Sequence, residues 1–213
     1  MLMHKINIMK KRLLKGAWFD TLTPIYDSLC TIFGLGENYR REIIENLQLG
    51  KGKLLDVGCG TGSLVIDISK LKSEIEIHAV DPDPKILAIA RKKSKGIKIK
   101  FKVAFAQKLP YPSNYFDVVV SSLAFHHMPG EEMKRKAMEE IYRVLKPKGK
   151  FLLSDFGRGK RFSLGPWLAN TFEKGQENYK GMIPQMLKDA GFKNVKIISE
   201  YKFGIDMVIG NKS

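Results

Sequence analysis

Short apolar runs rich in β-branched residues alternate with segments of helical periodicity along most of the chain. The runs with strand character are residues 53–57, 74–80, 97–103, 116–122 and 150–156. Apolar residues recur at helical spacing in residues 62–71, 84–94 and 131–145. Because parallel strands are joined by crossover connections that are usually helical, the alternation predicts an α/β fold: a parallel sheet with helices on both faces.

The C-terminal part of the chain departs from this alternation. After a helical segment at residues 178–192, two further strand-like runs follow at residues 193–199 and 204–210. These runs lie too close together for a helical crossover, so we expect them to form an antiparallel hairpin. The prediction is therefore a seven-stranded, mostly parallel sheet. We expect residues 1–50 to form a helical cap or lid and residues 51–213 to form one binding domain.

Length and composition restrict the class of protein. The chain has 213 residues, of which 44% are hydrophobic and 28% are charged, as in a globular domain. No stretch reaches the roughly 18 to 20 apolar residues of a membrane span, and the basic N-terminus lacks the apolar core and cleavage site of a secretory signal. We therefore expect a cytoplasmic location. The two cysteines, Cys30 and Cys59, are expected to be reduced, and the sequence predicts no metal site.

The chain is strongly basic, with 37 Lys and Arg against 22 Asp and Glu and a formal net charge of +15. Such a charge is compatible with binding to nucleic acid or to the surface of an anionic membrane. However, the excess is mostly lysine, it is scattered along the sequence, and few aromatic residues are interleaved for base stacking. A solvated lysine-rich surface is the preferred interpretation, and nucleic-acid or peripheral membrane contact stays open.

The sequence "LLDVGCGTG" at residues 54–62 marks a ligand site at the end of the first strand. Gly58, Gly60 and Gly62 allow a sharp turn into the following helix and a close approach of a ligand to the backbone. A dinucleotide turn has the spacing G-x-G-x-x-G, whereas this one is G-x-G-x-G with Asp56 ahead of it. A carboxylate there would repel a pyrophosphate and favours a ligand with a positive charge. The alternative is a tight turn without a ligand.

A second acidic residue, Asp81, ends the next strand in "HAVDPDP", about 20 residues beyond the glycine turn. An acid at this position typically binds the two hydroxyls of a ribose, and Pro82 beside it offers an apolar face to a base. Alternatively, Asp81 could cap the helix that begins near Pro84, although Asp83 is better placed for that role.

Four motifs in order carry a resemblance to a known family. They are "LLDVGCGTG", "VDPDP", "AQKLPYPSNYFDVVVSSLAFHHM" and "LKPKGKFLLSDF". Together they resemble the class I S-adenosylmethionine-dependent methyltransferases, which have a Rossmann-like sheet, and in particular the small-molecule branch that includes the ubiquinone and menaquinone biosynthesis enzymes. The resemblance runs from about Phe19 to the C-terminus. It implies that the protein uses S-adenosylmethionine as methyl donor and releases S-adenosylhomocysteine.

The resemblance also implies which residues bind this cofactor. They are Tyr26, Asp56, Gly58, Cys59, Gly60, Asp81, Pro82, Ala106, Gln107 and Ser121. Asp56 and the turn carbonyls would accept from the ammonium of the methionine part, the turn amides would donate to its carboxylate, and Asp81 would bind the ribose. The backbone at Ala106 and Gln107 would meet the adenine. The family commonly has an acid just before this Ala-Gln pair that binds the adenine amino group, whereas this chain has Phe105, so this contact is either lost, replaced by stacking or supplied by Gln107.

The methyl acceptor is less constrained by the sequence. His126 and His127 follow the fourth strand beside the expected methyl group and are the candidates for a general base, although either could only pack or cap the loop. The residues between the fifth strand and the last helix that suggest an apolar or aromatic small-molecule acceptor are Phe156, Phe162, Trp167, Leu168 and Phe172. The alternatives are an RNA or protein methyltransferase and a non-catalytic cofactor-binding module.

Overall fold

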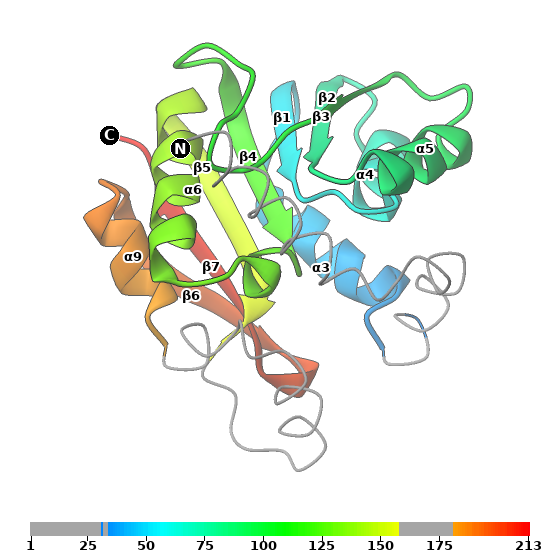
Figure 1. The fold of residues 1–213 in the computed structure, drawn as a ribbon. Helices are drawn as coiled ribbons and strands as arrows, with labels where there is room; N and C mark the ends of the chain where they lie inside the picture. The colour runs from blue at the N-terminus through cyan, green and yellow to red at the C-terminus, as the bar shows by residue number, and fades with distance from the viewer. Residues whose placement is uncertain (1–30, 32–33, 158–180) are drawn as a thin grey trace.

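The computed structural model describes residue 31, residues 34–157 and residues 181–213 (Figure 1). Several sequence-based expectations concern residues outside these ranges. They are Tyr26 as a cofactor contact, most of the cap at residues 1–50, and the aromatic side chains Phe162, Trp167 and Phe172.

A seven-stranded sheet forms the centre of the molecule (Figure 1). Its strands are β1 (Gly52–Val57), β2 (Ile75–Asp81), β3 (Ile99–Val103), β4 (Phe116–Ser122), β5 (Leu145–Phe156), β6 (Lys193–Tyr201) and β7 (Ile205–Asn211). Their order across the sheet is β3-β2-β1-β4-β5-β7-β6. The pairs among β1 to β5 are parallel, and β7 runs antiparallel to both β5 and β6. The predicted fold class, including the antiparallel C-terminal hairpin, is confirmed.

Helices cover both faces of this sheet, as the alternation of the sequence predicts. The described helices are α3 (Glu37–Leu47), α4 (Ser63–Leu71), α5 (Pro84–Lys93), α6 (Glu131–Val144) and α9 (Ile183–Asp189), with 3-10 turns η1 (Phe125–His127) and η2 (Lys202–Gly204). Buried residues of α3, α4 and α5 pack with one face of the sheet, and those of α6 and α9 with the other. Alternate residues of a strand point to opposite faces, so Leu54 and Leu55 belong to different halves of the core. None of the described helices is long and apolar enough to cross a bilayer.

Helix α3 is the main part of the predicted cap that the structure describes. Its residues Tyr39, Ile43, Ile44 and Leu47 are buried in the same core as α4. The Tyr39 hydroxyl lies 2.7 Å from Ser154 Oγ of β5 and 3.1 Å from Ser122 Oγ of β4. This part of the cap therefore packs against the sheet. A lid role for the rest of the segment stays a prediction.

The order of the strands determines where a ligand site is expected. Strand β1 has β2 on one side and β4 on the other, so successive strands are added first on one side of β1 and then on the other. In open α/β sheets, ligands bind at such a switch point, outside the carboxyl ends of the strands. The carboxyl ends of β1, β2 and β4 carry the glycine turn, Asp81 and the two histidines, respectively.

Candidate active site

The glycine turn after β1 is built tightly against its neighbours, except at one position. Gly58, Gly60 and Gly62 all have positive φ, of +78°, +52° and +78°. A Cβ atom at Gly58 would lie only 2.4 Å from Ala124 Cβ, whereas one at Gly60 would meet no atom of the described residues within 4 Å. Gly58 therefore allows close packing against the segment before η1, and Gly60 borders open space that a ligand can enter.

Four backbone amides of this turn, those of Gly58, Cys59, Gly60 and Gly62, form hydrogen bonds within the protein. Gly58 and Cys59 both donate to the carbonyl of Val80, at 2.8 and 3.0 Å, and Gly62 donates to the carbonyl of Cys59 at 2.9 Å. Gly60 donates to Asp81 Oδ2 at 3.0 Å. These four amides are therefore already bonded within the protein, and the expectation that turn amides bind a ligand carboxylate stays a prediction.

Asp81 connects the glycine turn to the end of β2. While Oδ2 accepts from Gly60, Oδ1 accepts from the amide of Asp83 at 2.9 Å. Asp83 in turn caps α5 by accepting from the amide of Lys85 at 2.8 Å. The capping role therefore belongs to Asp83. Burial raises the pKa of Asp81 although the two amides act in the opposite direction.

Asp56 is the most unusual group of the site. Its side chain lies under the turn and only 2% of the residue is exposed. Burial, and secondarily the charge of Asp81, raises the pKa of Asp56 to about 8. Within the described part of the chain, its Oδ1 atom has no hydrogen-bond partner. A buried acceptor of this kind is costly, and a bound cation or donor would supply what it lacks.

The segment that follows β3 lies beside Asp81, as expected for an adenine contact. Ala104 donates to the Asp81 carbonyl at 3.2 Å, and Ala106 is buried two residues later. The side chain of Gln107 points away toward α6, where Nε2 donates to the Met133 carbonyl at 3.4 Å. The backbone of this segment therefore lies next to Asp81, where the resemblance predicts a base, and the Gln107 side chain is engaged elsewhere.

Ser121 has a structural partner that the sequence did not reveal. It is fully buried, and its Oγ donates to the Val57 carbonyl at 2.7 Å. This bond joins the ends of β4 and β1 directly beneath the glycine turn. The residue thus supports the predicted methionine end of the site from below, and a contact of its hydroxyl with the ligand stays untested.

His126 forms a buried pair with Asp155, an acid at the end of β5. His126 Nδ1 lies 2.8 Å from Asp155 Oδ1. The same carboxylate accepts from the amides of Phe125 at 2.7 Å, His126 at 3.2 Å and Phe156 at 2.8 Å. Burial would raise the pKa of Asp155, but nearby His126 and the backbone amides hold it below its ordinary value. Asp155 therefore fixes both η1 and the imidazole ring.

The second histidine is placed differently. His127 is exposed, and its ring lies 3.9 Å from the His126 ring, centroid to centroid. His126 is the candidate that the buried carboxylate of Asp155 orients. Sequence reasoning missed Asp155, although its place at the carboxyl end of a parallel strand, in "SDF", is a signal for a site residue.

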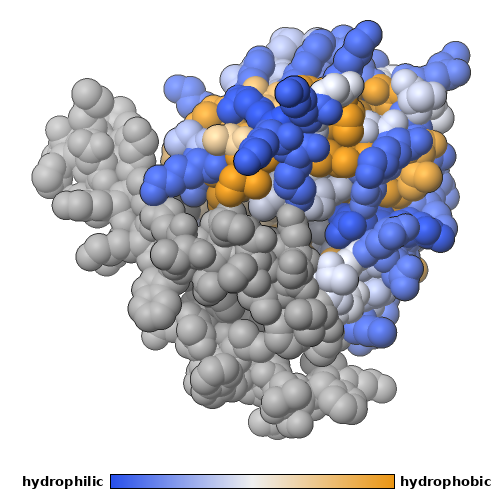
Figure 2. Space-filling view, turned by 90° about the vertical axis from the view of Figure 1, so that its right-hand side faces the viewer, coloured by the Kyte–Doolittle hydropathy of each residue, from blue (hydrophilic) through white to orange (hydrophobic). Residues whose placement is uncertain are grey.

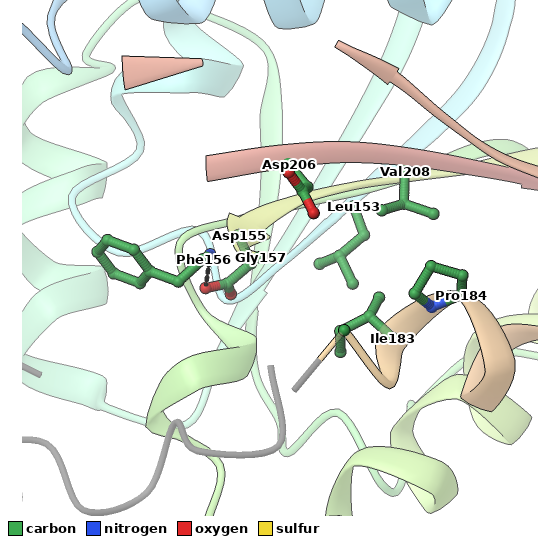
Figure 3. A pocket seen from close by; sticks show the side chains of 9 residues that line it. Leu153, Asp155, Phe156, Gly157, Ile183, Pro184, Asp206 and Val208 are labelled. Carbon is green, nitrogen blue, oxygen red and sulfur yellow. Dashed lines mark hydrogen bonds between the residues drawn. The ribbon is translucent and has the colours of Figure 1, made fainter. Parts of the chain in front are cut away.

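A pocket lies next to Asp155, between the end of β5 and the starts of β7 and α9 (Figure 3). Its walls are mostly apolar, and its lining includes Leu153, Phe156, Ile183, Pro184 and Val208. Asp206 of β7 lies opposite Asp155 in the strand ladder and also lines the pocket. A Cβ atom at Gly157 would lie 2.0 Å from Asp206 Oδ2, so a glycine is required where the chain passes this carboxylate.

Comparisons with known proteins agree with this geometry. The family described as "Methyltransferase domain" matches residues 55–153. The ubiquinone/menaquinone biosynthesis C-methyltransferase UbiE of Rickettsia akari is 28% identical over 224 residues, which cover 90% of this chain and 89% of that protein. The demethylmenaquinone methyltransferase of Thermus thermophilus is 33% identical over 143 residues, covering 65% of this chain and 64% of the relative.

Solved structures share the fold. A SAM-dependent methyltransferase from Aquifex aeolicus superposes with a TM-score of 0.67 at 22% identity, covering 82% of this chain and 89% of the other. Phosphoethanolamine N-methyltransferase 2 of Haemonchus contortus, in complex with S-adenosylhomocysteine, gives a TM-score of 0.71 at 23% identity, covering 87% of this chain and 44% of that one. Residues 55–153 thus match a methyltransferase domain, and the chain has the fold of the S-adenosylmethionine-dependent methyltransferases. It resembles the ubiquinone and menaquinone enzymes.

The residues of the methyltransferase fit its cofactor. S-adenosylmethionine carries an ammonium and a sulfonium, and the turn presents an unpartnered buried oxygen at Asp56 with open space at Gly60. A dinucleotide pyrophosphate would instead meet two acids here, Asp56 and Asp81. Among the described residues, no group of three or more His, Cys, Asp and Glu is arranged to hold a metal ion.

The raised pKa of Asp56 predicts an unusual pH dependence of stability in the cofactor-free methyltransferase. The folded protein holds a proton on Asp56 up to about pH 8, whereas the unfolded chain releases it near the ordinary carboxyl pKa of 3.8. The folded state therefore binds the extra proton between these values, and its stability falls as pH rises through this window. Between pH 6 and 7.5, we expect Asp56 to lower the free energy of unfolding by on the order of 2 kcal/mol.

Denaturant unfolding of the wild type and of Asp56→Asn at these two pH values measures this effect, since the amide cannot ionise. We expect the variant to lose less stability than the wild type on going to pH 7.5. Asp117→Asn is the matched control, because burial of Asp117 is outweighed by Lys146 and a backbone amide, which lower its pKa and keep it ionised at both pH values. Equal pH dependence of the wild type and Asp56→Asn would contradict the raised pKa.

Proposed function

We propose that this methyltransferase transfers the methyl group of S-adenosylmethionine to a small apolar or aromatic acceptor that carries an ionisable hydroxyl group. The observation that supports this acceptor class is the His126–Asp155 pair, whose carboxylate lies among mostly apolar side chains at the end of β5. The histidine suits removal of a proton from the acceptor, and the apolar side chains suit its hydrophobic part. Relatives named for quinone biosynthesis match most of the chain's length, which supports a quinone precursor as the first acceptor to test.

For the cofactor, we propose contacts at the two acids and the open glycine. Asp56 would accept from the ammonium, which would hold the carboxylate in its ionised form. Asp81 would accept from the ribose hydroxyls through the lone pairs that the Gly60 and Asp83 amides leave available. The backbone at Ala106 and Gln107 would meet the adenine. Cys59 contributes to the turn by its backbone, and Pro82 is exposed at the end of β2, where a base can lie against it.

The cofactor supplies a methyl group already activated by its positively charged sulfur. The remaining task of the protein is to position the acceptor and to control its proton. An Nδ1–H donor to Asp155 makes Nε2 the basic nitrogen of the neutral His126 ring. This nitrogen would take the hydroxyl proton of the acceptor, and the ionised Asp155 would stabilise the imidazolium that forms. The acceptor atom made electron-rich by this deprotonation would then receive the methyl group, and where that atom is a ring carbon, its own hydrogen would leave to solvent as a second proton.

Isotope transfer tests the proposed acceptor class. The purified chain is incubated with S-adenosylmethionine carrying a labelled methyl group and with prenylated hydroquinones, simple phenols, primary amines or bulk RNA, and the products are identified by mass spectrometry. We expect label in the hydroquinone or phenol products. Label only in RNA or in amines would overturn the proposal, and binding of the cofactor without turnover of any acceptor would favour a non-catalytic module.

A further inference from the structure

The helix α5 and strand β3 carry a large share of the positive charge of the protein. Residues 84–116 contain no Asp or Glu. The basic side chains of this segment are Lys85, Arg91, Lys92, Lys93, Lys95, Lys98, Lys100, Lys102 and Lys108, and all are exposed. The sequence shows these residues as a scattered run, whereas the fold gathers them on one edge of the sheet, because β3 is the edge strand and α5 packs on it. We call this surface the α5–β3 edge.

Apolar side chains lie between the lysines of the α5–β3 edge. Val103 is 53% exposed, and Ile97, Ile99 and Phe101 are half-buried. Figure 2 shows the side of the molecule on which α5 and β3 lie, with hydrophobic patches interspersed among hydrophilic side chains. The surface therefore combines exposed cationic side chains with partly exposed apolar side chains.

Four lysines of this edge have no ion pair with the rest of the described chain. Lys100 pairs with Glu76 at 2.5 Å. Within the described ranges, no carboxylate forms an ion pair with Lys92, Lys95, Lys98 or Lys102. Such a concentration of exposed positive charge attracts an extended anionic partner.

The α5–β3 edge also reaches the cofactor turn. Lys93 Nζ lies 2.7 Å from Ser63 Oγ and 3.2 Å from Thr61 Oγ1, and both residues belong to the start of α4 and the turn before it. A partner bound to this edge would therefore lie beside the rim of the active site.

We propose that the α5–β3 edge docks the methyltransferase on the surface of a bilayer that contains anionic lipids. Lysines gain from the negative surface potential of such a bilayer, and the aliphatic side chains between them can enter the headgroup region. Single-stranded nucleic acid fits less well, because base stacking needs exposed aromatic rings, and the aromatic side chains of this segment are buried or half-buried. The proposal stands without the proposed acceptor, since docking is a property of this edge alone.

Vesicle co-sedimentation of the full chain tests the proposal, with neutral phosphatidylcholine vesicles compared with vesicles containing 30% phosphatidylglycerol. We expect binding to the anionic vesicles only, weakening as salt is raised. The variant K92Q/K95Q/K98Q/K102Q should lower the partition coefficient by at least about tenfold, since each lysine near an anionic surface contributes measurably to binding. Val103→Ser should also lower it, in a manner that salt does not change.

Matched controls come from the opposite edge of the sheet, where β6 lies. The variant K148Q/K188Q/K193Q/K196Q removes the same charge from exposed lysines there, and Ile197→Ser alters an apolar side chain that is 40% exposed. Both should bind vesicles like the wild type. Equal losses in the two quadruple variants would show a net-charge effect and overturn the proposal. Saturable RNA binding at physiological salt that K92Q/K95Q/K98Q/K102Q abolishes, without vesicle binding, would assign the edge to nucleic acid instead.

Discussion

Replacing Asp81 with alanine is expected to weaken the binding of S-adenosylhomocysteine by at least about 100-fold. Two charge-assisted hydrogen bonds to the ribose would be lost, at roughly 1.5 to 3 kcal/mol each. The structure adds a second reason, because Asp81 Oδ2 also holds the amide of Gly60 at 3.0 Å and so fixes the turn that borders the open space. Isothermal titration calorimetry with S-adenosylhomocysteine measures the loss.

Two further variants separate binding from folding. Asp81→Asn keeps a carbonyl acceptor for one amide, so it should fold like the wild type and still lose most of the affinity. Asp83→Ala removes the neighbouring acid, whose side chain only caps α5, so it should lower stability by about 1 kcal/mol and leave the affinity unchanged. An unchanged dissociation constant in Asp81→Ala would rule out the ribose role. Tighter binding of NAD than of S-adenosylhomocysteine by the wild type would contradict the whole cofactor assignment.

Much of the fold follows from local patterns in the sequence. Strand β4 occupies the predicted residues 116–122, and α4, α5 and α6 lie within one residue of their predicted bounds. Strand β5 was predicted less well, since it begins at Leu145, five residues before the apolar run at Lys150. Its first part contains Pro147 and Gly149, which disfavour a strand locally, and the β4–β5 register is irregular there. Pairing with a neighbouring strand, rather than local sequence, therefore makes this segment part of β5.

The candidate site was likewise predicted from the sequence only in part. The glycine turn and Asp81 are each marked by a short local sequence motif. Because both motifs follow predicted parallel strands, the sequence placed them at the same edge of the sheet. The pairs Ser121–Val57 and His126–Asp155 join different strands, 64 and 29 residues apart, and no local pattern specifies them. The raised pKa of Asp56 likewise depends on burial beneath the turn, which only the packed structure reveals.

Ala124 connects the two parts of the proposed site, the glycine turn and the His126–Asp155 pair. Gly58 leaves room for its side chain, so the segment leading into η1 packs directly on the glycine turn. His126 follows two residues later, and Asp155 holds η1 by the amides of Phe125 and His126. The imidazole is therefore positioned relative to the cofactor turn by rigid contacts of strands and turns.

Asp155→Asn is expected to lower kcat by roughly 100-fold or more while leaving the affinity for S-adenosylhomocysteine within a few-fold of the wild type. In the proposed mechanism Asp155 is a positioning residue that orients His126, and general-base contributions of this kind are typically about 10² to 10⁴ in rate. The asparagine oxygen can still accept from the amides of Phe125 and His126, which both donate to Asp155 Oδ2, so η1 should stay in place although the Phe156 amide loses its acceptor. The measurement is steady-state kinetics with an acceptor that the isotope-transfer screen identifies.

The choice of acceptor distinguishes a role in proton transfer from a merely structural one. If Asp155 acts through His126, the loss should shrink with acceptors whose hydroxyl is already ionised at the assay pH, because these need no base. A structural defect would slow all acceptors equally and would also weaken cofactor binding. Asp117→Asn is the control, since Asp117 lies near the start of β4, far along the strand from η1, and also accepts a backbone amide, that of Lys53 at 2.8 Å. It should lower stability without changing kcat. A normal kcat in Asp155→Asn with a weakly acidic acceptor would remove His126 and Asp155 from the proposed mechanism.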